Sequence, residues 1–459
     1  MSRSTLLIAL ALLPLFNSFD RRLSAADDWK AGAAKISITP EKFMWMAGYS
    51  ARKAPADGML TDLWAKALVI EDGRGHRAAL ITLDLVGIDR DLSLSLCGRL
   101  EKQFGLKRDQ IAICSSHTHS GPVVNMALRP AHEQHLDDAQ KKLITEYVVV
   151  LQDKIVAAVA EAIEKKAPCK LAWNSGVATF AVNRRTNKEA DVPKIRESGE
   201  PLKGPIDHDV PVLSVQGMDG TLRAVVFGYA CHSTVLGLQQ WCGDYPGYAQ
   251  IELEAKHPGC VALFWAGCGG DQNPLPRRTV ELAKAYGQQL ASAVNEVLAR
   301  QLRPIQGELR TSYQEIPLAF DKLPTREQME TALAGKNPFE ASRARILLAQ
   351  IDSGKPLSPT YPYPVGIWHL GTDSQFIFLG GEVVVDYALR LKNELRGKQT
   401  WVAAYANDVM AYIPSRRVLL EGGYEGGGAM VYYGQPAIWS PEVETTIVNE
   451  VHRQAKLAP

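Results

Sequence analysis

The sequence predicts an α/β protein: a layered, mixed-sheet domain with its functional site at the C-terminal ends of the strands. The first observation is a series of short apolar runs, rich in β-branched and aromatic residues, with the length of buried strands. These predicted strands are Ala67–Ile70, Ala78–Leu83, Ile111–Cys114, Pro211–Val215, Ala224–Tyr229, Val261–Trp265, Phe376–Leu379 and Trp401–Tyr405. The second observation is that helical patterns lie between them, at Leu143–Lys165, Gly247–Lys256, Val280–Ala299 and Arg326–Ala334. Helices that alternate with largely apolar strands are typical of layered α/β proteins and not of β-sandwiches.

The third observation is that polar residues collect directly after five of these strands. The segments concerned are SSHTHSGP (115–122), ACHSTVLG (230–237), AGCGGDQNP (266–274), GGEVVVDY (380–387) and ANDVMAYIP (406–414). Ligands of open α/β sheets bind outside the carboxyl ends of the strands. The five segments therefore predict one convergent site.

Residues 1–26 have the pattern of a signal peptide. Arg3 precedes an apolar run from Leu6 to Phe16 that is too short to span a bilayer, and Ser24 and Ala26 are small at the expected cleavage positions. We therefore expect the mature chain, residues 27–459, to be exported to the periplasm or the extracellular space. No later segment has about 18 uninterrupted apolar residues, so no transmembrane segment is expected.

Composition narrows the choice of partners. The formal net charge of the 459-residue chain is +1, and a charge so near zero argues against a nucleic-acid partner. The seven cysteines permit up to three disulfides and leave at least one thiol free.

We interpret the Pro- and Gly-rich segment 354–366 as a connector inside the domain.

Histidine is rare, with ten in the chain, yet His117 and His119 flank a single threonine at one strand end. In an extended segment these two side chains share a face. His232 and Glu382 follow two other strands, and a buried carboxylate needs a cation or a metal to offset its desolvation. Each of these residues alone also fits a packed polar side chain. Together, two imidazoles, a carboxylate and an open position form the pattern of catalytic zinc, which acidifies a bound water for attack on a carbonyl.

Six segments resemble the neutral (non-lysosomal) ceramidase family, and the resemblance extends from about Ala33 to Gly434. These segments are AAKISITPEKFMWMAGYS (33–50), HTHSGP (117–122), VNRRTN (182–187), ACHSTVLG (230–237), GCGGDQNP (267–274) and AYIPSRRVLLEGGYEGG (411–427). The resemblance implies a zinc-dependent hydrolase acting on linear amides. Its expected reaction is hydrolysis of the N-acyl amide bond of ceramide or a related N-acyl lipid to a fatty acid and a sphingoid base, through zinc-bound water. Such a substrate is reached from a membrane surface.

The resemblance also implies roles for individual residues. The expected Zn²⁺ ligands are His117, His232, Glu382 and Tyr412. Around the scissile amide it places His119, Arg184 and Tyr424, with proton handling assigned to His119 and contacts to the oxyanion or to a hydroxyl assigned to Arg184 and Tyr424.

Two departures from the family pattern bear on the substrate. The family's Gly-Asp-x-Ser-Pro-Asn turn is matched by Gly270 and Asp271, but Asn273 stands where the serine is expected. Asn273 is therefore a candidate catalytic residue that offers an amide in place of a hydroxyl. The family's ceramidases also continue into an immunoglobulin-like C-terminal domain, and we expect this chain to hold the catalytic domain only, over residues 27–459.

Other classes of hydrolase fit the sequence less well. An amidohydrolase barrel is disfavoured because several predicted strands precede His117, and a serine hydrolase is disfavoured because the chain has no G-x-S-x-G elbow. Two alternatives remain: an exported zinc amidohydrolase acting on a non-ceramide N-acyl substrate, and a non-catalytic binding protein that retains the fold.

Overall fold

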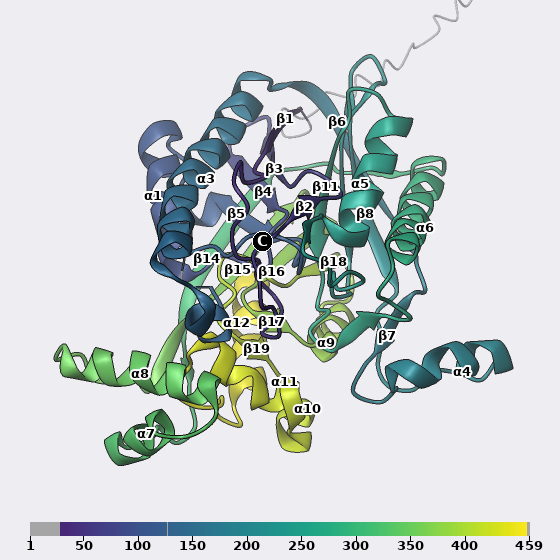
Figure 1. The fold of residues 1–459 in the computed structure, drawn as a ribbon. Coiled ribbons are helices and arrows are strands. Elements are labelled where there is room, and N and C mark those ends of the chain that lie inside the picture. The colour runs from purple at the N-terminus through teal and green to yellow at the C-terminus, as the bar shows by residue number, and fades with distance from the viewer. Residues whose placement is uncertain (1–27, 126, 457–459) are drawn as a thin grey trace, which may run out of the picture.

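Two β-sheets lie face to face in the computed structural model, which describes residues 28–125 and 127–456 (Figure 1). The predicted signal peptide, residues 1–26, lies outside these described residues. The larger sheet has nine strands in the order β11-β9-β8-β6-β1-β3-β4-β5, and β13 pairs with β6. Their bounds are β1 Trp29–Ser37, β3 Trp64–Glu71, β4 Arg77–Leu83, β5 Ile111–Ser115, β6 Ala167–Val177, β8 Asp209–Gly217, β9 Leu222–Tyr229, β11 Val261–Ala266 and β13 Arg303–Pro304. The sheet is mixed because β4 runs parallel to β5 and β9 runs parallel to β11, while the other pairs are antiparallel.

The second sheet has the order β14-β15-β16-β18. Its strands are β14 Leu309–Ala319, β15 Thr360–Leu370, β16 Ser374–Leu379 and β18 Gln399–Ala403. Side chains alternate between the two faces of each strand. In β16, Phe376 and Phe378 point into the core between the sheets, whereas Ile377 and Leu379 point to the helices on the other side. Burial on both faces explains why such strands form continuous apolar runs.

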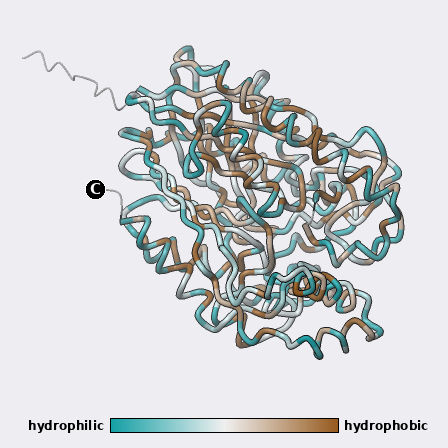
Figure 2. Tube along the Cα trace, turned by 90° about the vertical axis from the view of Figure 1, so that its left-hand side faces the viewer, coloured by the Kyte–Doolittle hydropathy of each residue, from teal (hydrophilic) through white to brown (hydrophobic). Residues whose placement is uncertain are grey.

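Helices cover the outer face of each sheet and complete four layers. On the larger sheet, α1 Arg90–Phe104 and α3 Asp138–Glu164 pack over one half, and α5 Asp244–Lys256 and α6 Val280–Leu298 pack over the other. On the second sheet lie α9 Val385–Glu394 and α12 Val443–Ala455. Figure 2 shows the hydrophobic residues concentrated inside these layers.

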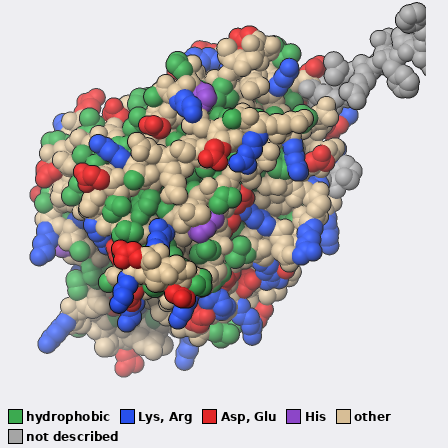
Figure 3. Space-filling model, turned by 90° about the vertical axis from the view of Figure 1, so that its right-hand side faces the viewer, with side chains coloured by type: hydrophobic (Ala, Val, Ile, Leu, Met, Phe, Trp, Pro, Cys, Tyr) green, Lys and Arg blue, Asp and Glu red, His purple; other side chains and the backbone are tan. Residues whose placement is uncertain are grey.

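A helix pair, α7 Arg326–Leu333 and α8 Pro338–Asp352, projects from the layered body and is held together by its own small apolar cluster (Figure 1). Four short helices lie in the connections: α2 Arg129–His132, α4 Val192–Ser198, α10 Arg416–Glu421 and α11 Gly423–Gly426. No helix within the described residues combines the length and the apolar character needed to cross a bilayer. Figure 3 shows basic and acidic side chains intermixed over one face of the molecule.

The predicted α/β class is confirmed, and every predicted strand and helix overlaps an observed one. The interpretation of segment 354–366 as a connector holds for residues 354–359, which link α8 to β15, and was wrong for the rest, because Thr360–Leu370 is strand β15. Pro362 and Pro364 are tolerated there because β16 pairs with β15 only from Val365 onward, so one side of the strand needs no N–H donor at the prolines. All seven cysteines are buried free thiols, and none of the permitted disulfides forms.

Candidate metal centre

The predicted ligands come from four segments that meet at one edge of the sheets. His117 lies two residues after β5, and His232 lies three residues after β9. Glu382 begins β17 (Glu382–Val383), which pairs in parallel with β19 (Tyr412–Ile413) so that Glu382 lies directly beside Tyr412. The register of this short pair therefore brings together two residues that are thirty positions apart in the sequence.

The four predicted ligands present their polar atoms to one another in a buried space. Oε2 of Glu382 lies 3.2 Å from Nε2 of His117 and 2.9 Å from Nε2 of His232. The hydroxyl of Tyr412 lies 3.1 Å from Nε2 of His232. Ligand atoms about 2.0–2.1 Å from a tetrahedral zinc are separated by roughly 3.3 Å. The observed separations are close to this value, so the residues fit such an ion.

Hydrogen bonds on the far side of each ring fix which nitrogen of the two histidines faces this space. Nδ1 of His117 lies 2.6 Å from the carbonyl oxygen of Val86, and Nδ1 of His232 lies 2.6 Å from that of Gly269. A carbonyl only accepts, so Nδ1 carries the proton in both rings. In the neutral ring Nε2 then presents a lone pair, as it does in histidines that bind metals.

The buried carboxylate and imidazoles of this cluster favour a bound cation. Burial lowers the pKa of His232 to about 4, so the ring is neutral at pH 7. Burial alone raises the pKa of the Glu382 carboxyl, but the neighbouring His117 and His232 reverse this and hold it well below its usual value. That relief requires a proton or a positive charge at the histidines: when Nε2 of each ring presents a lone pair, Oε2 of Glu382 has no hydrogen-bond donor among the described residues. Such an arrangement is costly unless a positive ion lies among these atoms.

Tyr433 holds the other oxygen of this carboxylate. Its hydroxyl donates a hydrogen bond to Oε1 of Glu382, which leaves Oε2 turned toward the histidines. Sequence reasoning missed Tyr433, because its position depends on how the segment after α11 packs back onto the site. No spacing within the sequence indicates that contact.

His119 joins the cluster but differs from the other two histidines. Its Nε2 lies 3.0 Å from Nε2 of His117, and the three rings form a buried group able to hold a metal ion. Its Nδ1, however, is buried without a hydrogen-bond partner among the described residues. Burial, together with His117 and His232, holds the pKa of His119 well below its usual value. A metal-bound histidine almost always donates its second N–H, so His119 is the least typical ligand of the three.

The backbone around the histidine pair is not extended as the sequence suggested. His117 has a φ of +58°, in the left-handed region that non-glycine residues seldom adopt, and the described segment 116–118 belongs to no strand. The expected convergence of His117 and His119 is observed, but this turn and not strand alternation produces it. Gly48 makes room for His119, because a Cβ at residue 48 would lie 2.5 Å from its ring.

Arg184 connects the remaining predicted residues. It follows β7 (Ala181–Asn183), which pairs with β12 (Gln272–Pro274). Its backbone N–H donates a hydrogen bond to the backbone carbonyl oxygen of Asp271. Its guanidinium donates to the hydroxyl of Tyr412 at 3.0 Å and to Oδ1 of Asn273 at 3.2 Å. The ring of Tyr424 lies 5.3 Å from that of Tyr412 and is 47% exposed. All eight predicted site residues therefore lie in one connected group.

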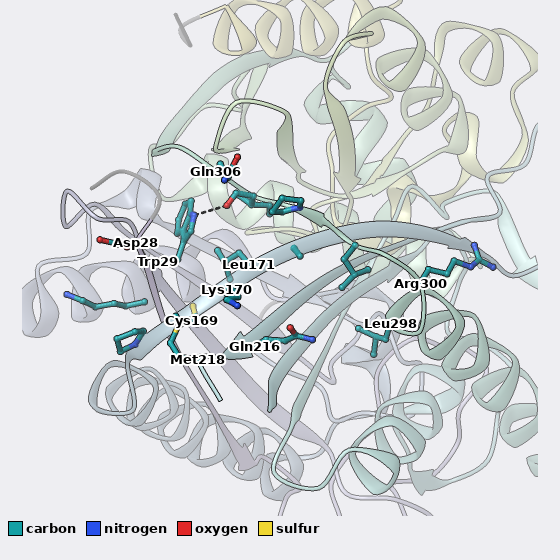
Figure 4. A pocket seen from close by; sticks show the side chains of 16 residues that line it. Asp28, Trp29, Cys169, Lys170, Leu171, Gln216, Met218, Leu298, Arg300 and Gln306 are labelled. Atoms are coloured by element: carbon teal, nitrogen blue, oxygen red, sulfur yellow. Dashed lines mark hydrogen bonds between the residues drawn. The ribbon is translucent and has the colours of Figure 1, made fainter. Parts of the chain in front are cut away.

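A cavity of about 560 Å³ opens beside this group, lined in part by Arg184, Asn273 and Tyr424. The larger cavity of about 840 Å³ lies elsewhere, along β6 near Trp29 and the end of α6 (Figure 4). None of the eight predicted site residues lines that larger cavity. Cavity volume alone therefore does not identify the predicted site in this molecule.

The fold and the site together define a layered α/β protein with a buried histidine and carboxylate centre suited to a metal ion. The chain belongs to the neutral/alkaline non-lysosomal ceramidase family, whose N-terminal model matches residues 29–274. Membership identifies it as part of a family of hydrolases that act on amides.

Individual relatives agree with this assignment. A neutral ceramidase from Pseudomonas aeruginosa is 24% identical over 510 aligned positions, which cover 94% of this chain and 73% of the relative. A neutral ceramidase from Drosophila melanogaster is 32% identical over 98 residues, or 20% of this chain and 14% of the relative. The crystal structure of neutral ceramidase from Pseudomonas aeruginosa is similar in fold, with a TM-score of 0.72 at 21% identity over 93% of this chain and 74% of that one. A structure described as ceramidase complexed with C2 gives a TM-score of 0.71 at 19% identity, over 93% and 76% of the two chains.

Proposed function

We propose that this protein is a zinc-dependent amidase that hydrolyses the N-acyl amide bond of ceramide or a related N-acyl lipid. The observation that carries the metal is the buried set of His117, His232, Glu382 and Tyr412, in which imidazole lone pairs face an ionised carboxylate. Membership of the ceramidase family supports the amide bond as the target. The products are then a fatty acid and an amine, which for ceramide is a sphingoid base.

Zinc held by these four residues supplies a Lewis acid for the substrate carbonyl and lowers the pKa of a bound water. The chain's own residues provide proton transfer, stabilisation of the developing negative charge and contacts to the substrate. His119, with a neutral ring beside His117, takes up and returns the proton that moves during hydrolysis. Arg184 holds a fixed positive charge 3.0 Å from the hydroxyl of Tyr412 and stabilises negative charge that develops on the carbonyl oxygen. Tyr424, at the exposed side of the group, contacts a substrate hydroxyl.

Residues 27–459 act in this proposal as one catalytic domain, and the pattern of residues 1–26 supports export to the periplasm or the extracellular space. A lipid substrate is then met at a membrane surface. The domain bounds and the export of the protein are inferred from the sequence pattern alone.

The experiment is to measure metal content and substrate cleavage on the same preparation. We expect about one zinc per chain by elemental analysis, loss of activity on chelation and recovery with zinc. A panel of N-acyl sphingoid bases, N-acyl amino acids and short peptides defines the substrate. Cleavage of peptides but not of N-acyl compounds contradicts the proposed substrate, and a protein without stoichiometric zinc is explained better as a binding protein that retains the fold.

Asn273→Ala is expected to weaken the enzyme without abolishing its activity. The side chain accepts a hydrogen bond from Arg184, and its amide cannot act as a nucleophile. Loss of one ordinary hydrogen bond costs roughly 0.5–1.5 kcal/mol, or about two- to tenfold in rate. Steady-state kinetics of zinc-loaded protein measure this loss. Asn273→Ser is the matched variant, and we expect it to be tolerated.

A covalent acyl-protein adduct in mass spectrometry, or complete inactivity of Asn273→Ala with zinc still bound, contradicts this role.

A further inference from the structure

The cavity beside the metal centre is lined mainly by charged side chains, which is unexpected for a site that takes a neutral lipid. We call it the charged pocket. Its charged lining residues are Arg184, Arg185, Lys188, Arg277, Glu189, Glu421 and Glu425. The four cations outnumber the three carboxylates, and apolar lining comes chiefly from Leu275 and the ring of Tyr424.

The pairing inside the charged pocket leaves positive charge available. Arg184 and Arg185 share one buried carboxylate, since Nε of Arg184 lies 2.7 Å from Oε1 of Glu425 and Nη1 of Arg185 lies 2.6 Å from Oε2. Arg185 also pairs with Glu421, and Arg277 pairs with Glu189, so the three arginines and three carboxylates of the pocket balance and the one excess positive charge belongs to Lys188. Lys188 is exposed and has no ion pair or hydrogen bond from its side chain within the described part of the chain.

Two more arginines lie near the centre, beside Tyr49. The ring of Tyr49 lies 4.8 Å from that of His119. The guanidinium groups of Arg52 and Arg278 lie 5.4 Å and 6.0 Å from the centre of the Tyr49 ring. Arg52 donates to backbone carbonyls, including that of His119, whereas Arg278 is exposed and makes no ion pair with a described residue. These guanidinium groups add positive charge near the centre, where it attracts negative charge.

An aromatic track leads away from the same centre. From the buried Tyr412 the ring-to-ring distances are 5.3 Å to Tyr424, 6.1 Å from Tyr424 to Tyr432 and 5.0 Å from Tyr432 to Phe339 on α8. Partly exposed aromatic rings in series offer apolar contact to an extended hydrocarbon chain. The site thus combines a surface for an acyl chain with a pocket for a negative charge.

We propose that the substrate is an anionic amphiphile: an N-acyl amide whose amine part carries a negatively charged group, such as a carboxylate, near the scissile bond. The inference rests on the proposed amidase function and narrows its substrate class. Because the acyl chain is apolar, the charge belongs to the amine part. A carboxylate in the charged pocket pairs with Lys188, whose charge no carboxylate of the pocket offsets, and lies near the guanidinium groups of Arg184 and Arg185, a type of group that binds carboxylates particularly well. Neutral ceramide leaves this charge uncompensated.

The test compares two amides with the same short acyl chain below their micelle-forming concentrations. N-octanoylglycine is anionic and N-octanoylethanolamine is its neutral counterpart, and N-octanoylsphingosine represents ceramide. For zinc-loaded protein we expect kcat/KM to be about tenfold higher for the glycine compound, since a hydrogen bond to a charged group is worth about that factor or more. Its KM should rise with salt concentration, because salt screens exposed charges.

Lys188→Glu is expected to reduce the ratio of the two kcat/KM values about fivefold, in line with the contribution of an exposed charge. Lys256→Glu is the matched control, because Lys256 is an exposed lysine at the C-terminal end of α5, and it should leave the ratio unchanged. Calorimetric binding of both amides to metal-free protein provides a measurement that does not depend on turnover.

Equal or better binding and cleavage of N-octanoylethanolamine overturns the anionic substrate class while the amidase function stands. If zinc-loaded protein cleaves none of the three compounds, the proposed function fails. The binding comparison on metal-free protein then still decides whether the charged pocket selects anions.

Discussion

Replacing His232 with alanine is expected to remove most of the bound zinc and, with it, nearly all turnover. His232 presents Nε2 to both Glu382 and Tyr412, so it lies at the centre of the proposed ligand set. Removing even an outer partner of a metal ligand typically costs about 10–100-fold in metal affinity, so loss of a ligand should cost at least about 100-fold. Elemental analysis after dialysis at a fixed free zinc concentration measures the change directly.

His257→Ala is the matched control, since His257 is bonded to Asn295 between α5 and α6 and lies away from the site. That variant should keep its zinc. Zinc should also raise the thermal unfolding temperature of the wild-type protein, because an ion bound only by the folded state stabilises it, and this shift should disappear in His232→Ala. A His232→Ala protein with a full complement of zinc removes His232 from the ligand set.

The sequence predicted those parts of the fold that are buried on two faces. Strands such as β9 and β16 form uninterrupted apolar runs because one face meets the opposing sheet and the other meets helices. β14 was missed because it is only partly buried and carries the polar run RTSYQE, which gives no apolar pattern. The stacking of the second sheet on the first was also missed, since it depends on contacts between strands far apart in the chain.

The site, too, has features that could be predicted from the sequence and features that could not. The convergence of His117, His232 and Glu382 could be predicted because polar residues that follow buried strands collect at one edge of a sheet. The carbonyls of Val86 and Gly269 set the orientation of both histidine rings. These contacts could not be predicted from the sequence, because any residue type supplies a backbone carbonyl. Packing of separate loops decides such contacts.

The second large effect is expected for His119→Ala, which should lose activity while it keeps zinc. The ring of His119 lies beside the cluster, but its Nδ1 lacks the hydrogen-bond partner that orients His117 and His232. A positioned general acid or base contributes about 10²–10⁴-fold to a rate, so kcat should fall by that factor. Single-turnover kinetics on zinc-loaded protein, with metal content measured on the same sample, tests both halves of the prediction.

The result also decides between two arrangements of ligands that the geometry allows. His117, His119 and His232 form a group that could hold an ion by themselves, whereas the proposed set replaces His119 with Glu382 and Tyr412. If His119 is a ligand, His119→Ala loses zinc and activity together, as His232→Ala does. If His119 handles protons, zinc stays and exogenous imidazole should restore part of the rate, because it replaces the missing base and not a missing ligand. Tyr412→Phe completes the comparison: it should weaken zinc binding only in the proposed arrangement.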